Sequence, residues 1–291
     1  FRSGQRGVQR RQVSVDSLAA LKADGEPIVM VTAYDYPSAQ IAEEAGVDLV
    51  LVGDSAGNVV LGHDSTVQVS VEEMLMLSRA VRRGLRTPML VVDLPFGSYE
   101  ASDEDAVRTA QRFVKEAGAD AVKLERGGTS VQRAQAIIDA GIPVMGHIGL
   151  TPQTATSLGG LKVQGRTVEQ ALRLVRDAEA LEAVGCFAIV LEAVPAAVAA
   201  LIAQRLGCVT IGIGAGSQTD GQVLVWHDLL GITTGHVAKF VRQFADVRAT
   251  SLQGVEAYVE AVRDGEFPAV EHTYAISPDE LDALTAALAE R

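Results

Sequence analysis

Six ionisable side chains stand at or next to the ends of short apolar runs in the middle of the chain. They are Asp54 after LVLVG, Asp93 after MLVV, Lys123 and Glu125 around Leu124, His147 at the end of PVMGH, and Glu192 at the end of FAIVLE. A buried charge is costly unless it is paired or used, so core packing alone does not explain the set. If the runs are strands of a parallel barrel, their ends meet on the face where active sites lie. The pattern therefore predicts one polar site built from five strands.

Three of these residues indicate a metal site. Asp54, Asp93 and Glu125 supply hard oxygen donors, which suit Mg2+ or Mn2+. Zinc is disfavoured because the chain has no Cys/His cluster. A metal at this point would polarise a carbonyl group as a Lewis acid.

The other three residues fit the same chemistry. Glu192 closes an almost entirely apolar run and suits a general base. Lys123 can balance a substrate carboxylate or a developing enolate, and His147 can donate to an oxyanion. The set favours enolisation of a 2-oxo acid, in which C3 loses its proton and the carbanion adds to an electrophile.

Two glycine-rich stretches imitate motifs of other enzyme classes. Gly53–Gly57 (GDSAG) matches the nucleophile elbow of hydrolases, but a Gly-broken stretch follows where that motif needs a helix. We therefore expect Ser55 to hydrogen-bond a ligand or the turn. Ile211–Ser217 (IGIGAGS) departs from the dinucleotide fingerprint, which disfavours a dinucleotide site. The long stretch Gly57–Ser70 is typical of a lid over an active site.

The segments that would position these residues alternate between apolar runs and amphipathic helices. The predicted strands are Ile28–Thr32, Asp48–Val52, Met89–Val92, Ala121–Leu124, Pro143–Met145, Phe187–Leu191, Val209–Ile213 and, with the weakest pattern, Val223–Trp226. The predicted helices are Tyr36–Ala45, Val71–Arg83, Glu104–Ala117, Ser130–Ala140, Val168–Val184, Ala196–Leu206, Leu252–Asp264 and Pro278–Ala289. Continuous apolar strands are typical of a parallel sheet covered by helices on its faces.

Eight such strands predict a (β/α)8 TIM barrel, with an open doubly wound sheet as the alternative. No linker or change of composition divides the chain. We therefore expect residues 1–13 to form a polar tail and residues 14–291 to form one barrel domain with C-terminal helices.

Composition narrows the function classes. The 291 residues carry a net charge of −12, which disfavours nucleic-acid binding. The longest apolar run, Ala193–Ala203, is too short to span a bilayer, and no apolar segment follows the arginine-rich start as a signal peptide requires. Cys186 and Cys208 are expected to be buried thiols rather than a disulfide framework. A cytoplasmic enzyme without membrane or nucleic-acid partners is the natural expectation.

Several ordered motifs resemble the ketopantoate hydroxymethyltransferase family. The carriers are TAYDYPSA, LVGDSAGNVVLGHDST, DLPFGSY, AVKLE, PVMGHIGLTPQ, GGLKVQGR, IVLEAVP and GIGAGSQTDGQVLVWHD, from about Val31 to Val247. The resemblance implies a (β/α)8 barrel that assembles as a homo-oligomer, a decamer. It also implies transfer of a hydroxymethyl group from 5,10-methylenetetrahydrofolate to 2-oxoisovalerate with Mg2+, on the route to pantothenate and coenzyme A.

The resemblance also implies roles for single residues. The metal ligands would be Asp54, Asp93 and Glu125, and the substrate contacts would be Asp54, Ser55, Asp93, Lys123 and His147. Glu192 would accept the proton. One departure is Arg126, which stands between Glu125 and the Gly127-Gly128 pair where the family reads KLEGG.

Three other readings compete with this one. The GDS motif and the metal carboxylates also resemble the isocitrate lyase and phosphoenolpyruvate mutase barrels, although the lyases carry a catalytic Cys that has no counterpart here. Lys123 is a candidate for the Schiff base of a metal-free aldolase. A barrel that only binds folate or a 2-oxo acid is the non-catalytic alternative.

Overall fold

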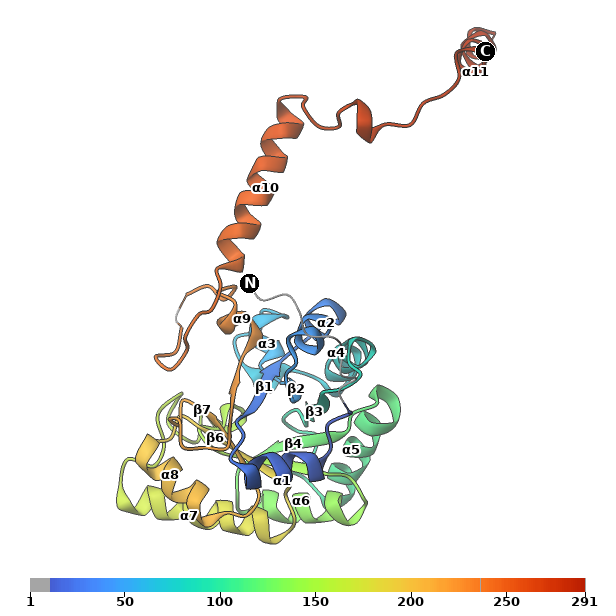
Figure 1. Ribbon diagram of the computed structural model, residues 1–291. Helices are drawn as coiled ribbons and strands as arrows, with labels where there is room; N and C mark the ends of the chain where they lie inside the picture. Colours follow the sequence, from blue (N-terminus) through green and yellow to red (C-terminus); the bar gives the residue numbers. More distant parts are fainter. Residues whose placement is uncertain (1–10, 236, 291) are drawn as a thin grey trace. The chain divides into compact units, whose positions relative to one another are not determined.

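Eight parallel strands form a closed barrel in chain order (Figure 1). The structure is a computed structural model, and it describes residues 11–235 and 237–290. The strands are β1 (Ile28–Thr32), β2 (Leu49–Val52), β3 (Met89–Asp93), β4 (Ala121–Glu125), β5 (Val144–Gly149), β6 (Ala188–Glu192), β7 (Val209–Ile213) and β8 (Gly221–Leu224). The predicted barrel is confirmed, and the open sheet is wrong because β8 closes onto β1.

Two strands differ from their predicted bounds by more than one residue. Strand β5 continues to Gly149, four residues beyond Met145, because its end pairs with β6 up to Glu192. Strand β8 begins two residues earlier than predicted, at Gly221, which pairs with Ile28 on one side and Ile211 on the other. Both differences have the same cause: glycine and polar residues extend these strands, so an apolar run alone does not mark their ends.

The strands separate two hydrophobic layers. On β4, Ala121 belongs to the cluster inside the barrel, whereas Val122 and Leu124 belong to the layer between the barrel and its helices. Side chains alternate between the two faces of a strand, so Lys123 and Glu125 share the inner face with Ala121. Both side chains therefore face the interior of the barrel.

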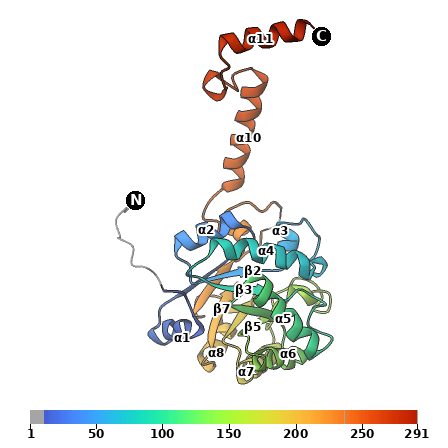
Figure 2. The same cartoon turned by 90° about the vertical axis from the view of Figure 1, so that its right-hand side faces the viewer.

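A ring of helices covers the outside of the barrel (Figure 2). It consists of α2 (Tyr36–Ala45), α4 (Val71–Gly84), α5 (Asp103–Ala117), α6 (Thr129–Asp139), α7 (Val168–Ala183) and α8 (Ala196–Arg205). These helices match the predicted ones to within one residue at each end. Strand β7 leads directly to β8 without a helix, and α9 (Trp226–Leu229) is a single turn. A dinucleotide fingerprint needs a helix directly after its glycines, so the direct connection removes that reading of IGIGAGS.

One helix before β1 was not predicted. Helix α1 (Val15–Asp24) begins at a reciprocal capping box between Ser14 and Ser17, and its Leu18 packs into the cluster inside the barrel. Most of the predicted N-terminal tail lies outside the described residues, but the backbone N–H of Val13 donates to Thr87 O at 2.8 Å.

The predicted lid Gly57–Ser70 has structure of its own. It contains most of α3 (Ala56–Val59) and the 3-10 turn η1 (Thr66–Gln68). A Cβ on Gly57 would lie 2.6 Å from Val69 Cγ2, so the two ends of the segment are packed together. The stretch is therefore not the featureless loop that the glycines suggest.

Residues Phe244–Arg291 form a second compact unit, separate from the barrel unit that ends at Gln243. It contains α10 (Val247–Arg263), the 3-10 turn η3 (Val270–His272) and α11 (Pro278–Ala289), none of which has a buried residue. Helix α10 begins five residues before the predicted Leu252 because the carboxylate of Asp246 accepts the N–H of Ala249.

The described part of the chain contains no helix that is both long enough and apolar enough to cross a membrane. Cys186 is buried as expected, but Cys208 is only half-buried. Both cysteines precede their strands, β6 and β7. They therefore lie at the end of the barrel opposite the strand ends that carry Asp93, Glu125 and Glu192, and a catalytic Cys of the lyase kind has no place there.

Candidate active site

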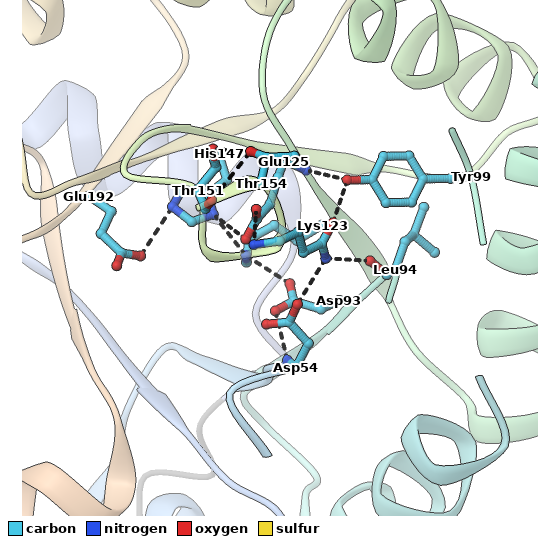
Figure 3. A network of polar contacts seen from close by, with 11 residues as sticks. Asp54, Asp93, Leu94, Tyr99, Lys123, Glu125, His147, Thr151, Thr154 and Glu192 are labelled. Carbon is cyan, nitrogen blue, oxygen red and sulfur yellow. Dashed lines mark hydrogen bonds and ion pairs between the residues drawn. The ribbon is translucent and has the colours of Figure 1, made fainter. Parts of the chain in front are cut away.

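The C-terminal ends of neighbouring strands bring the predicted carboxylates and Lys123 together (Figure 3). Register places Asp93 of β3 opposite Lys123 of β4, and the Lys123 Nζ lies 2.8 Å from Asp93 Oδ1. The backbone N–H of Asp54, two residues after β2, donates to Asp93 Oδ2 at 3.0 Å. Asp54, Asp93, Lys123 and Glu125 are each no more than 4% exposed.

His147 lies between two carboxylates from adjacent strands. Its Nδ1 is 3.4 Å from Glu125 Oε1 on β4, and its Nε2 is 3.2 Å from Glu192 Oε2 on β6 (Figure 3). Burial and the nearby Lys123 lower the pKa of the ring, but the contacts with Glu125 and Glu192 outweigh them and raise it to about 9. The ring is therefore an imidazolium at neutral pH, and it pairs with Glu192 by charge, since its Nε2 makes no hydrogen bond to any described residue.

The site carries more negative than positive charge. Four carboxylates, those of Asp54, Asp93, Glu125 and Glu192, face only the Lys123 ammonium and the imidazolium. Burial and the neighbouring charges of Asp93 and Glu125 raise the pKa of Asp54 well above its ordinary value. The same carboxylates overcome the effect of burial on Lys123 and raise its pKa. The carboxyl groups of this network thus outnumber its two cationic side chains.

A divalent cation would supply positive charge, and the oxygen donors suit Mg2+. Within residues 11–235 and 237–290, however, no three Asp, Glu, His or Cys side chains are already arranged as a metal-binding group. Lys123 stands beside Asp93 and His147 stands beside Glu125. The residue types and the excess of carboxylates fit a cation. To bind it, Asp93 would have to turn from Lys123, and Glu125 would have to turn from His147.

Ser55 lies at the edge of this network. Its Oγ is 2.9 Å from the hydroxyl of Tyr34, which follows β1 and is 3% exposed. Burial raises the pKa of Tyr34, so its hydroxyl stays protonated. In the described chain Ser55 has no hydrogen bond to a histidine, so the Ser–His pair of a hydrolase is not formed. The hydroxyl pair of Tyr34 and Ser55 is instead suited to hold an anionic oxygen.

Sequence reasoning missed three residues of the site: Tyr34, Tyr99 and Gln153. Gln153 donates to Asp54 Oδ2, and the Tyr99 hydroxyl both accepts from the backbone of Glu125 and donates to Gln153. All three belong to the quoted motifs TAYDYPSA, DLPFGSY and GLTPQ. Each of the three follows the end of a strand, and this position could have identified it. None of them carries a charge, so the search for charged residues did not find them.

Two other histidines lie apart from the charged network. His63 Nε2 is 3.9 Å from Glu73 on α4, and the His227 ring stacks on Tyr34 with the ring centres 5.5 Å apart. Burial lowers the pKa of His227, so it adds no positive charge at neutral pH.

Comparison with known proteins identifies the family of this chain. Residues 12–270 match the model of a family described as ketopantoate hydroxymethyltransferase. A 3-methyl-2-oxobutanoate hydroxymethyltransferase of Carboxydothermus hydrogenoformans is 51% identical over 273 residues, which cover 94% of this chain and 99% of the relative. The enzyme of that name from Moorella thermoacetica is 52% identical over 266 residues, which cover 91% and 99%.

Solved structures show the same fold in more distant proteins. A phosphonopyruvate hydrolase in complex with oxalate and Mg2+ aligns with a TM-score of 0.60 at 15% identity, over 96% of this chain and 97% of its own. A phosphoenolpyruvate phosphomutase from Streptomyces platensis aligns at 0.59 and 16%, over 95% and 97%. At this identity the likeness shows the barrel fold alone. The family match and the identity of about half with full-length relatives decide the assignment: this chain belongs to the ketopantoate hydroxymethyltransferase family, a family of hydroxymethyltransferase enzymes.

Proposed function

We propose that the protein transfers a hydroxymethyl group from 5,10-methylenetetrahydrofolate to 2-oxoisovalerate and forms ketopantoate, for pantothenate and coenzyme A synthesis. One observation supports the proposal above all. The carboxylates at the strand ends, Lys123 and His147 form one connected network, and this network reaches Glu192. The names of the relatives support the product. In the balanced reaction C3 of the 2-oxo acid loses a proton and bonds to the transferred carbon, water supplies the hydroxyl, and tetrahydrofolate leaves.

A divalent cation, Mg2+ in this proposal, would be held by Asp54, Asp93 and Glu125. When bound, it supplies Lewis acidity at the carboxylate and keto oxygens of the 2-oxo acid. The unbalanced negative charge of the site supports this assignment. The distant phosphonopyruvate hydrolase, described in complex with oxalate and Mg2+, pairs such a barrel with a metal and a small dicarboxylate.

Glu192 is the proposed acceptor of the C3 proton. Its side chain is 17% exposed, the most open of the four carboxylates, so it can reach a substrate in the barrel mouth. The imidazolium of His147 lies 3.2 Å from one oxygen of Glu192 and would attract that oxygen by charge, which leaves the other oxygen to take the proton. His147 thereby orients the base as well as lining the pocket.

Lys123 and Ser55 are the proposed contacts to the anionic parts of the 2-oxo acid. The ammonium of Lys123 is fixed by Asp93 and is placed to stabilise the enolate oxygen as the proton leaves. The Schiff-base alternative is disfavoured, because a lysine that forms an imine needs a lowered pKa, and the carboxylates around Lys123 raise its pKa.

A single NMR assay tests the reaction. The purified chain is mixed with 2-oxoisovalerate and 5,10-methylenetetrahydrofolate in D2O, with Mg2+ or with EDTA. We expect metal-dependent loss of the C3 proton signal and formation of ketopantoate. Exchange without product would point to another electrophile, and a folded chain showing neither signal would favour a binding-only barrel.

Glu192→Gln separates the base from the rest of the site. The variant should bind 2-oxoisovalerate but lose C3 proton exchange, since the amide cannot accept the proton. Retained exchange would refute the role of Glu192. Asp93→Ala should weaken Mg2+ binding measured by titration calorimetry, and an unchanged affinity would remove Asp93 from the metal site.

The assembly as a homo-oligomer, a decamer, and a cytoplasmic location complete the proposal. Both rest on the family to which the chain belongs. Sedimentation equilibrium of the full chain would measure the number of subunits directly, and a value that does not match ten would correct it.

A further inference from the structure

Gln153 makes hydrogen bonds through both ends of its side-chain amide and through its backbone N–H, next to the carboxylates of the site. It lies in the 3-10 turn η2 (Pro152–Thr154) after β5 and is 4% exposed. Its Nε2 donates to Asp54 Oδ2 and to Leu94 O, each at 2.9 Å. Its backbone N–H donates to Glu125 Oε2 at 3.1 Å. One residue therefore holds one oxygen of a carboxylate that follows β2 and one of a carboxylate on β4.

The chemistry of the partners fixes the orientation of the amide. Leu94 O can only accept a hydrogen bond, so the atom beside it must be the NH2 group. The carbonyl Oε1 then faces Tyr99, whose hydroxyl must donate to it at 2.7 Å. The backbone N–H of Glu125 donates to the same hydroxyl at 3.3 Å. Only one arrangement of protons satisfies every member, which makes this a rigid support.

Gln153, which donates to the carboxylates, and Tyr99, which donates to Gln153, differ from Lys123 and His147 because they are neutral. Lys123 and His147 would repel an arriving cation, whereas the amide and the phenol carry no net charge. Tyr99 is 1% exposed and lies beside Glu125 and Leu94 at one side of the network (Figure 3). Each carboxylate keeps one oxygen that this pair does not engage, Oδ1 of Asp54 and Oε1 of Glu125.

We propose that Gln153 and Tyr99 form a positioning pair that orients the carboxylates of Asp54 and Glu125 for binding a divalent cation. The inference rests on the metal site of the proposed function and deepens it. Neither residue touches the cation or the substrate in this account. Residues that orient metal ligands from behind change metal affinity by about 10–100-fold when they are replaced.

The test is titration calorimetry of the full chain with Mg2+, and with Mn2+ in a second series. Gln153→Met keeps the length and volume of the side chain but removes its donors, and we expect about 10–100-fold weaker binding. Tyr99→Phe removes one hydroxyl, and we expect a smaller loss in the same direction. The double variant should lose less than the sum of the two single losses, because Tyr99 and Gln153 share one hydrogen bond.

The matched control is Gln170→Met, the same change at an exposed glutamine on α7, and it should leave the affinity unchanged. Circular dichroism and urea unfolding show whether each variant is folded. If Gln153→Met fails to fold, Tyr99→Phe still decides, because it removes a single oxygen.

A folded Gln153→Met that binds Mg2+ within about threefold of the wild type would overturn the inference, as would strictly additive losses in the double variant. These outcomes leave the proposed function intact. A wild-type chain that binds no divalent cation would instead overturn the metal part of the proposed function, and this inference with it.

Discussion

Raising the pH should remove a stabilising charge from the interior of the metal-free barrel. His147 is 2% exposed, and its contacts with Glu125 and Glu192 overcome burial and Lys123 to raise its pKa from 6.5 to about 9. A raised pKa means that the folded state binds the proton more tightly than the unfolded chain. The stabilisation is therefore complete below about pH 6.5 and is lost as the pH rises through about 9.

The magnitude follows from the two pKa values. Their difference, at about 1.36 kcal/mol for each pH unit, corresponds to about 3 kcal/mol of unfolding free energy. For a chain of this size about 1 kcal/mol moves the Tm by roughly 2–4 °C, so the expected change is roughly 6–12 °C.

The assay compares the wild type with His147→Gln by thermal and urea unfolding in EDTA, at pH 6 and pH 9.5 and one protein concentration. The wild type should lose about 3 kcal/mol more than the variant over this interval. His272→Gln, a change at an exposed histidine of the C-terminal unit, should follow the wild type.

Parallel pH dependence in the wild type and His147→Gln would refute the placement of the imidazolium between the two carboxylates. Repeating the series with Mg2+ adds a second check. A cation that draws Glu125 away from the ring should move the transition toward lower pH, and a transition that stays in place would contradict that competition.

Three further predictions concern the rim of the site. Gly149→Ala should destabilise the protein by roughly 2–4 kcal/mol in urea unfolding, because φ is 99° and a Cβ would collide with Glu192 O. Arg126→Gly should stabilise it by up to about 1 kcal/mol, because Arg126 has a φ of 74°, and a loss of stability would contradict this. Tyr34→Phe should raise the KM for 2-oxoisovalerate about fivefold, with kcat and Mg2+ affinity little changed, because Ser55 loses a partner worth about 1 kcal/mol.

The charged residues of the site could be predicted because each stands at or next to the end of an apolar run that indicates a strand. Apolar runs mark buried strands, and a charge at the end of such a run has few structural reasons to be there. The alternation on β4 further places Lys123 and Glu125 on one face. The same logic placed Asp54, Asp93 and His147 without reference to any relative.

The neutral residues of the site could not be predicted in this way. Gln153 and Tyr99 lie in turns, and a glutamine or tyrosine in a turn is ordinary in any protein. Their role depends on contacts across 54 positions of the sequence. Helix α1 was not predicted for a related reason. Only Leu18 is buried in it, so its sequence has a weak amphipathic pattern. A sequence pattern indicates which side of a segment is buried. The roles of Gln153, Tyr99 and helix α1 depend instead on which distant segment packs against them.

The departure at Arg126 shows how the backbone limits what a motif implies. Arg126 stands between Glu125 and the glycine pair, yet its backbone N–H donates to His147 O at 2.8 Å. The register of β4 and β5 is thus kept up to Glu125, the proposed metal ligand, and Arg126 takes the left-handed conformation that glycine usually provides. The strain is local, so Glu125 keeps its place.

The partners of the carboxylates divide the site into a fixed half and a movable half. Gln153 donates to one oxygen each of Asp54 and Glu125, and Tyr99 donates to Gln153. Both residues are neutral, so an arriving cation has no electrostatic reason to displace them. Lys123 holds Asp93 by charge, so a cation must compete for that carboxylate. The ammonium pairs with Asp93 in this structure, and in the proposed mechanism it would become available to the substrate oxygens if a cation competed for Asp93. A buried lysine that only paired with Asp93 would gain little over an apolar residue, whereas one that exchanges partners couples metal binding to substrate charge.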